Sequence, residues 1–214
     1  MPTVDEAIQI LEEEGVNEEV LHYVERAARF HGHICPGLAV GCVASMIVLQ
    51  RFPPSADEEL VAVVENDSCS VDAIQVLTGC TFGKGNLFHY DYGKSVYTFY
   101  SRGSSKAIRL AMKDVYSRLK DDFDLFQKVV SGRATEDERR RMWEAKIRNS
   151  ASILKMRPEE VFTVKEVPFQ LPPFAKIYRS VKCDRCGEMV SEGKIVQVGG
   201  KRLCIPCARE VGAL

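Results

Sequence analysis

Two cysteine pairs near the end of the sequence carry its most specific chemical signal. They are Cys183 with Cys186 and Cys204 with Cys207, each in a Cys-x2-Cys spacing. Four thiolates arranged in this way are the ligand set of a tetrahedral structural zinc ion. Because the stretch around them has few apolar residues, a bound metal rather than a hydrophobic core must hold it together. Two disulfides or a redox dithiol are the alternatives, but neither pair is flanked by a secretory signal that would favour disulfides.

The residues around these pairs indicate the kind of zinc module. Gly187 tolerates the positive φ of a knuckle, in which backbone N–H groups turn toward the sulfurs. Residues 194–203 contain Gly199-Gly200 and predict a hairpin, and a helix-compatible tail follows Cys207. A knuckle, a hairpin and a ligand pair at a helix start, in this order, predict a treble-clef or zinc-ribbon module.

A second group of metal-binding residue types precedes an apolar run. His31, His33 and Cys35 supply three soft or borderline ligands within five residues, which a protein core does not need. Because Cys35 precedes Pro36, it is expected at the N-cap of a helix, where the positive helix end favours a thiolate. The alternative is that these side chains only pack in the core.

Cys69 repeats this arrangement at the start of another helix. It follows the apolar run Leu60–Val64, which predicts a strand covered on both faces. Ligand sites in α/β sheets lie outside the carboxyl ends of strands, and the helix starts should lower the pKa of the Cys35 and Cys69 thiols. We therefore predict a labile core site for zinc or another transition metal, or a reactive-thiol site. Its members are His33, Cys35 and Cys69, with His31 and Cys80 as further members.

Two other motifs favour no chemistry of their own. The glycines between Gly79 and Gly85 permit close backbone approach, but the spacing around Lys84 differs from that of a phosphate-binding P-loop. Three arginines at residues 139–141 lie in a stretch rich in Glu and Asp, which is typical of a solvated helix face. With a net charge of −1, the chain also lacks the basic excess of a nucleic-acid binder.

Hydrophobic periodicity and capping residues predict the elements that would position these side chains. Thr3 and Thr135 each begin a capping box, Asn17 caps a second helix, and residues 34–49 form an apolar run expected to be a buried helix. Further helices are expected over residues 70–77 and 104–119, and strands over 60–64, 96–100 and 162–167.

Length and composition accommodate one core domain with the zinc module as an appendage. The chain has 214 residues, of which 45% are hydrophobic. We predict an α+β core over residues 1–167, a proline-stiffened linker over 168–178 and the zinc module over 179–214. The apolar run at 34–49 is short for a membrane span, and acidic residues interrupt any N-terminal signal. A cytoplasmic protein without membrane contact is therefore expected.

Small residues in the apolar run predict an association surface. Gly37, Gly41 and Ser45 fall at successive i+4 positions and permit close approach of another backbone. We expect a homodimer formed through the N-terminal core.

Three segments give the sequence a specific resemblance to a known family. FHGHICPG at residues 30–37, VENDSCSVDAIQ at 64–75 and TGCTFGKGNL at 78–87, followed by DYGK, resemble the FmdE family of formylmethanofuran dehydrogenase subunits. The resemblance implies a thioredoxin-like core with a mixed β-sheet flanked by helices, followed by a treble-clef zinc finger. It also implies a metal site on His31, His33 and Cys35, closed by Cys69 and Cys80, with Asp72 as a neighbouring carboxylate.

Two classes of function remain open. The family's link to molybdenum or tungsten formylmethanofuran dehydrogenases implies an accessory or delivery protein, whose cleft handles metal or pterin and whose zinc finger docks oxidoreductase subunits. The alternative is a stand-alone metal-dependent or thiol-redox enzyme of anaerobic metabolism, with Cys69 and Asp72 as catalytic candidates. We favour the accessory protein because no clear general base is present beyond Asp67 and Asp72. A transcription-type protein is disfavoured by the single finger and the mildly acidic core.

Overall fold

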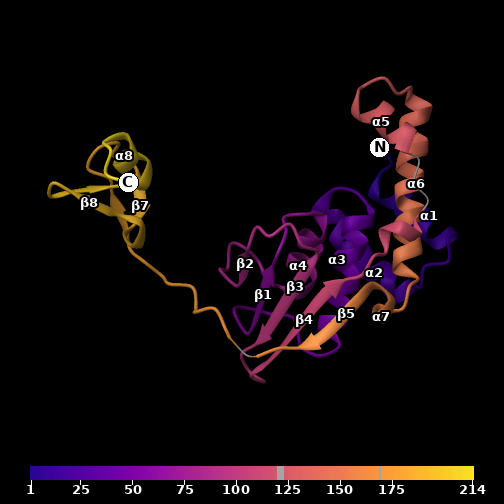
Figure 1. Cartoon of the computed structure of the whole chain (residues 1–214), viewed down its shortest axis with the longest axis horizontal. Helices are drawn as coiled ribbons and strands as arrows, with labels where there is room; N and C mark the ends of the chain where they lie inside the picture. Colours follow the sequence, from indigo (N-terminus) through magenta and orange to yellow (C-terminus); the bar gives the residue numbers. More distant parts are fainter. Residues whose placement is uncertain (120–122, 169) are drawn as a thin grey trace. The chain divides into compact units, whose positions relative to one another are not determined.

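Two compact units make up the chain, Met1–Phe174 and Ala175–Leu214 (Figure 1). The computed structural model describes residues 1–119, 123–168 and 170–214. The boundary between the units falls inside the predicted linker at 168–178. Among the described residues, no helix combines the length and the apolar character needed to cross a bilayer.

Helices of the first unit begin where the sequence predicts caps. The side chains of Thr3 and Thr135 each accept the backbone N–H three residues on, and that of Asn17 accepts the N–H of Glu19. These bonds satisfy N–H groups that have no partner within the helix. The helices are α1 (Val4–Glu13), α2 (Glu18–His31), α3 (Pro36–Leu49), α4 (Cys69–Thr78), α5 (Phe123–Val130), α6 (Glu136–Leu154) and α7 (Pro158–Val161).

Helix α3 is buried along most of its length, as its apolar sequence predicts. Its small residues let α4 approach closely, since a Cβ added at Gly41 would overlap the carbonyl oxygen of Ser70. A Cβ added at Gly37 would lie 3.2 Å from the Cβ of Cys69, and the hydroxyl of Ser45 donates to the Gly41 carbonyl. The small-residue stripe is thus occupied by α4 of the same chain and is not available as a dimer surface. The homodimer stays a prediction.

A five-stranded mixed sheet completes this unit, with the order β2-β1-β3-β4-β5. Strand β1 pairs parallel with β2 through a crossover that contains α4, and the other pairs are antiparallel. Helices packed on a mixed sheet confirm the α+β prediction. The strands are β1 (Leu60–Val64), β2 (Leu87–His89), β3 (Val96–Ser101), β4 (Lys106–Met112) and β5 (Phe162–Glu166).

Alternate residues of the central strands share one hydrophobic core with the helices. Leu60 and Val64 of β1 and Tyr97 and Phe99 of β3 belong to it. Helices α3 and α4 pack against each other beside the sheet, and α6 packs on α3 (Figure 1). Because β1 and β2 are parallel, with Val64 opposite His89, their carboxyl ends lie side by side at one end of the sheet.

Residues 104–119 do not form the predicted helix. Lys106–Met112 is strand β4, and Tyr116–Arg118 is a short 3-10 helix, η1. The turn at 102–105 returns the chain antiparallel to β3, and β5 pairs with the other edge of β4. Ile108 and Leu110 face the core in strand alternation. Pairing on both edges therefore outweighs the helical spacing of the apolar residues.

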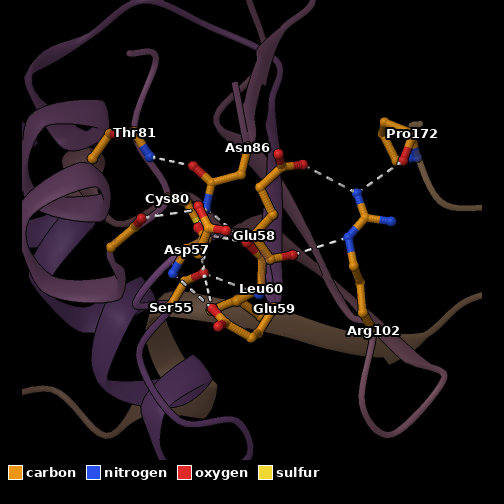
Figure 2. A network of polar contacts seen from close by, with 11 residues as sticks. Ser55, Asp57, Glu58, Glu59, Leu60, Cys80, Thr81, Asn86, Arg102 and Pro172 are labelled. Carbon is orange, nitrogen blue, oxygen red and sulfur yellow. Dashed lines mark hydrogen bonds and ion pairs between the residues drawn. The ribbon is translucent and has the colours of Figure 1, made fainter. Parts of the chain in front are cut away.

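The fold itself uses the glycine-rich segment at residues 79–85. A Cβ added at Gly79 would overlap the carbonyl oxygen of Ser55, so the close approach is to the protein's own backbone. Lys84 Nζ donates a hydrogen bond of 3.1 Å to the same carbonyl. These contacts occupy the lysine that a phosphate-binding loop would use. The buried amide of Asn86 joins the same loops, with partners at Asp57, Leu60 and Thr81 (Figure 2).

Arg102 fixes the segment that leads out of this unit (Figure 2). Its Nε donates to the carbonyl of Glu58 at 2.9 Å, and its Nη2 donates to that of Pro172 at 3.3 Å. The guanidinium carbon also lies 3.6 Å from the ring centre of Phe174, a favourable cation–π contact. Arg102 therefore holds the first part of the predicted linker on the core.

The second unit is built from two short hairpins and a helix. Its apolar cluster contains Leu203, Ala208 and three partly buried valines besides the cysteines. A cluster of this size supports the predicted dependence on bound metal. Strand β6 (Ser180–Lys182) pairs with β7 (Met189–Ser191), the 3-10 helix η2 (Glu192–Lys194) follows, β8 (Val196–Val198) pairs with β9 (Lys201–Leu203), and α8 spans Ile205–Glu210. The predicted hairpin and helical tail are thus confirmed.

Candidate metal centre

Four donor groups meet in the first unit. One ligand atom from each of His31, His33, Cys35 and Cys69 lies within 4.8 Å of the others. His31 ends α2, Cys35 is the N-cap of α3, and Cys69 is the first residue of α4. Two imidazoles and two thiols at these distances suit zinc or another borderline transition metal. The structure thus brings together four of the five core residues that the sequence predicts as ligands.

Local backbone geometry places three of these groups close together. Gly32 ends α2 in the left-handed region, at φ 92°, which reverses the chain after His31. Cys35 has the extended backbone of an N-cap, and Pro36 occupies the first turn of α3. The Sγ atom of Cys35 accepts the N–H of Leu38 at 3.5 Å. The predicted N-cap position of Cys35 is confirmed.

Asp72 orients the imidazole of His31. Its Oδ2 atom lies 2.7 Å from Nδ1 of His31. When Nδ1–H donates to this carboxylate, Nε2 carries the lone pair and is the nitrogen left for a metal. Nε2 is buried and has no hydrogen-bond partner among the described residues. A buried polar atom without a partner costs free energy, so the residues fit a bound cation.

The thiol of Cys35 differs from the prediction made for helix starts. Burial raises its pKa to about 11, the N–H of Leu38 acts weakly in the opposite sense, and the adjacent Cys69 adds to the increase. The predicted lowering is wrong for Cys35 in the metal-free chain, because loss of hydration outweighs the helix end. This thiol is protonated at neutral pH, and only a cation would favour its thiolate.

Helix α6 covers the side of the cluster at His33. The ring of Trp143 meets His33 edge-on with 5.3 Å between centroids, and Lys146 Nζ lies 4.7 Å from the Trp143 ring centre. Burial lowers the pKa of His33, and the charges of His31 and Lys146 act in the same direction. The neutral imidazole that results is the form that binds metal. The sequence does not reveal that Trp143 reaches the site.

A chain of hydroxyl groups fixes the start of α4 around Cys69. The Tyr97 hydroxyl lies 2.6 Å from Ser70 Oγ, which lies 2.8 Å from Ser68 Oγ. Ser68 Oγ in turn donates to Asn66 Oδ1 at 2.8 Å. Tyr97 is fully buried in the middle strand, β3. Cys69 is therefore tied to the sheet on both sides, through contacts that no sequence pattern indicates.

Cys80 lies outside the cluster. It follows α4, whose ten residues separate it from Cys69 by about 15 Å at 1.5 Å per residue. Its buried Sγ donates to the carbonyl of Leu60 at 3.4 Å, and burial raises its pKa to about 12. Cys80 is thus a packing residue in this structure, as Cys42 is within α3.

A pocket of about 300 Å³ opens beside the cluster, at the carboxyl ends of β1 and β2. Three residues of the centre, His31, Cys69 and Asp72, form part of its wall. The sequence indicates the side of the pocket that follows β1, but it gives no signal for His89, because a three-residue strand has no recognisable pattern. The remaining lining residues are Val64, Asn66, Asp67, Ser68, Val71, Leu87 and His89.

The second unit holds the predicted four-cysteine site. One sulfur from each of Cys183, Cys186, Cys204 and Cys207 lies within 4.8 Å of the others. The N–H of Cys204 donates to Cys183 Sγ at 3.3 Å, and the Sγ atoms of Cys186 and Cys204 are 3.9 Å apart. Sulfurs of both pairs thus surround one point, which is the geometry of a tetrahedral zinc site.

The metal-free thiols of this site oppose one another's ionisation. Backbone N–H groups, that of Cys204 foremost, lower the pKa of Cys183 to about 6. Its neighbours, with Cys204 foremost, raise the pKa of Cys207 to about 12. One thiolate is therefore accommodated without a cation, but four require one.

Two family models match the two units. Residues 30–163, more than half of the chain, match the family described as FmdE, molybdenum formylmethanofuran dehydrogenase operon. The chain belongs to the FmdE family. Residues 176–211 match the prokaryotic dksA/traR C4-type zinc finger. Together with the four clustered sulfurs, this match identifies a structural zinc site in the second unit of the FmdE chain.

Two proteins similar to the FmdE chain are informative. It is 31% identical over 207 residues to a probable S-adenosyl-L-methionine-binding protein of Archaeoglobus fulgidus. The match covers 92% of the chain and 55% of the relative, so the chain spans about half the length of that curated protein. A crystal structure of an FmdE-like protein of the tungsten formylmethanofuran dehydrogenase type, from Syntrophus aciditrophicus, matches with a TM-score of 0.54 and 21% identity. The alignment covers 91% of this chain and 95% of that one, which shows a shared fold.

Proposed function

We propose that this FmdE-family chain is a metal-binding accessory protein of a molybdenum or tungsten formylmethanofuran dehydrogenase-like system. The core would hold one zinc or other transition-metal ion on His31, His33, Cys35 and Cys69. The zinc finger would dock a partner protein of that system.

The buried Nε2 atom of His31 supports this proposal most directly. Asp72 fixes the ring through Nδ1, and Nε2 has no partner among the described residues although its surroundings exclude water. A histidine that only packed in a core would place both nitrogens on hydrogen-bond partners. A metal ion at the cluster would instead satisfy Nε2.

The ligand set favours holding a metal ion over exchanging water on it. Two nitrogens and two sulfurs fill the four positions of a tetrahedral ion, whereas catalytic zinc keeps one position open. The two catalytic candidates therefore take other roles in this proposal. Cys69 is a ligand, and Asp72 orients His31.

A stand-alone metal-dependent enzyme is the second candidate. The pocket beside His31 and Cys69 favours it, because a substrate could enter next to the ion. Thiol-redox chemistry has less support. It needs a thiolate near neutral pH, and burial raises the pKa of Cys35 to about 11.

The proposal extends to the finer architecture of both units. A mixed sheet flanked by helices, with the parallel unit β1-α4-β2, supports a thioredoxin-like core. In the second unit, the Cys183–Cys186 knuckle precedes the β8–β9 hairpin, and Cys204 begins α8. This order supports a treble clef.

The partner system is proposed from the names of related proteins. The family description refers to a molybdenum formylmethanofuran dehydrogenase operon, and the Syntrophus protein is described as FmdE-like, after a tungsten formylmethanofuran dehydrogenase. These names support association with oxidoreductase subunits in the cytoplasm of an anaerobic cell. We also propose that the chain is a homodimer. Light scattering that returns only a 24.0 kDa particle over a wide concentration range would contradict the dimer.

Metal titration of protein with an intact finger zinc tests the core site. Wild type should bind one further equivalent of zinc or cobalt per chain. Cys35→Ser and Cys69→Ser should each lose that equivalent, because each removes a ligand. Cys80→Ser is the matched control, since it changes a buried cysteine outside the cluster and should keep the ion. Wild type that takes up no second metal contradicts the core site.

Partner binding tests the accessory role. Cys186→Ser should abolish binding to the purified oxidoreductase subunits while keeping the core ion, because the two units are separate compact bodies. Undiminished binding would remove the finger from the docking surface.

A further inference from the structure

The pocket beside the core cluster has ionisable groups of one dominant sign. Those that line it are Asp67, Asp72, His31 and His89, and no lysine or arginine of the described chain joins them. Asp72 is engaged by His31, whereas Asp67 is exposed. Two thiolates balance the charge of a divalent ion, so a metal bound at the cluster would not offset the carboxylates. The pocket therefore favours a cation over an anion.

Another part of the lining is apolar. Val64 and Leu87, at the ends of β1 and β2, are buried, and Val71 contributes from the first turn of α4. A volume of about 300 Å³ lies at the lower end of the range for small-molecule sites. The pocket thus offers apolar contact for a body of about one ring, next to a carboxylate.

We propose that this pocket binds a small molecule with an apolar body and a protonated amine, which the carboxylate of Asp67 holds. His89 supplies a second polar contact on the β2 side. This inference rests on the proposed function, because the ligand lies against His31 and Cys69 of the metal centre. Phosphate-bearing molecules are disfavoured, since Asp67 and Asp72 would repel them.

Two probes of similar size and opposite charge test this assignment, phenethylammonium and 3-phenylpropionate. Their binding to the full, metal-loaded chain is followed by NMR through the backbone amides of residues 66–72 and 87–89. Wild type should bind phenethylammonium at least roughly fivefold more tightly, as expected for one partly exposed carboxylate. His89→Ala should weaken phenethylammonium binding by roughly threefold, through loss of one polar contact.

Charge variants identify the group responsible. Asp67→Asn should bring the two affinities within about twofold of each other. Asp91→Asn, the same charge change at an exposed aspartate that does not line the pocket, should keep the preference. Equal affinities in wild type, tighter binding of 3-phenylpropionate, no shift at the pocket amides with either probe, or a preference that survives Asp67→Asn would each overturn the proposal.

Metal content measured on the same samples separates this proposal from the one on which it rests. Wild type that holds no core ion contradicts the proposed function. Wild type that holds the ion but shows no charge preference contradicts only the amine pocket.

Discussion

The Oδ2 atom of Asp72 lies 2.7 Å from Nδ1 of His31, and this contact joins the first turn of α4 to the last residue of α2. It fixes the ring and the tautomer, so that Nε2 is the free nitrogen. The carboxylate thus links the packing of two helices to the chemistry of the centre.

Asp72→Ala should weaken core metal binding by about 10- to 100-fold, because His31 loses the group that orients its ring. Competition with a chelator measures the affinity. Asp91→Ala serves as the control, since it removes an exposed carboxylate away from the cluster. An Asp72→Ala affinity equal to that of wild type would show that the contact only ties two helices together.

Gly41→Ala should destabilise the first unit by about 1–3 kcal/mol in urea unfolding, as overpacking typically does. The new Cβ would overlap the backbone of Ser70, next to Cys69, so metal affinity should fall as well. Gly83→Ala is the matched control, because nothing lies within 4 Å of its added Cβ. Similar unfolding midpoints for the two variants would contradict the close packing of α3 on α4.

Cys35 in the metal-free chain should be alkylated at pH 7.5 about 100-fold more slowly than in urea, because the thiolate reacts and burial raises the pKa to about 11. From about pH 9, the ordinary thiol pKa, the unfolded chain releases a proton that the folded chain keeps. The folded state should therefore lose stability between about pH 9 and 11, while the alkylation rate rises. Mass spectrometry of the Cys35 peptide measures the rate. Fast reaction of folded protein at pH 7.5 would restore the activated thiolate that the helix start predicts.

Arg102→Ala should release the segment around Pro172 and Phe174, since the side chain donates to one and lies over the ring of the other. Chymotrypsin should then cut after Phe174 several-fold faster, because a protease needs locally unfolded chain. Arg140→Ala, at an exposed ion pair with Asp137, is the control. Unchanged cleavage would mean that other contacts hold the linker.

Ligand spacing and helix caps made much of this protein predictable. The paired cysteines specify the finger, and Pro36 after Cys35 specifies an N-cap. These signals are local, so they appear in sequence. The helix predicted over 104–119 failed because strand pairing with β3 and β5 decided that segment, which no local pattern records.

The parts of the site that escaped prediction depend on contacts between distant segments. Trp143 reaches His33 only through the packing of α6, and the Tyr97 hydroxyl meets Ser70 across the core. Cys80 was included because it shares a helix with Cys69, although the length of that helix separates the two thiols. The pKa of Cys35 depends on burial, which the sequence around a helix start does not reveal.

X-ray absorption at the zinc edge tests most directly whether the core ion is bound by His31, His33, Cys35 and Cys69. The sample is the full chain carrying Cys186→Ser and Cys204→Ser, so that only the core site holds zinc. We predict two sulfur neighbours at about 2.3 Å and two nitrogen neighbours at about 2.0–2.1 Å. A shell of nitrogen and oxygen alone, a shell of four sulfurs, or a chain that retains no zinc would contradict the core metal centre.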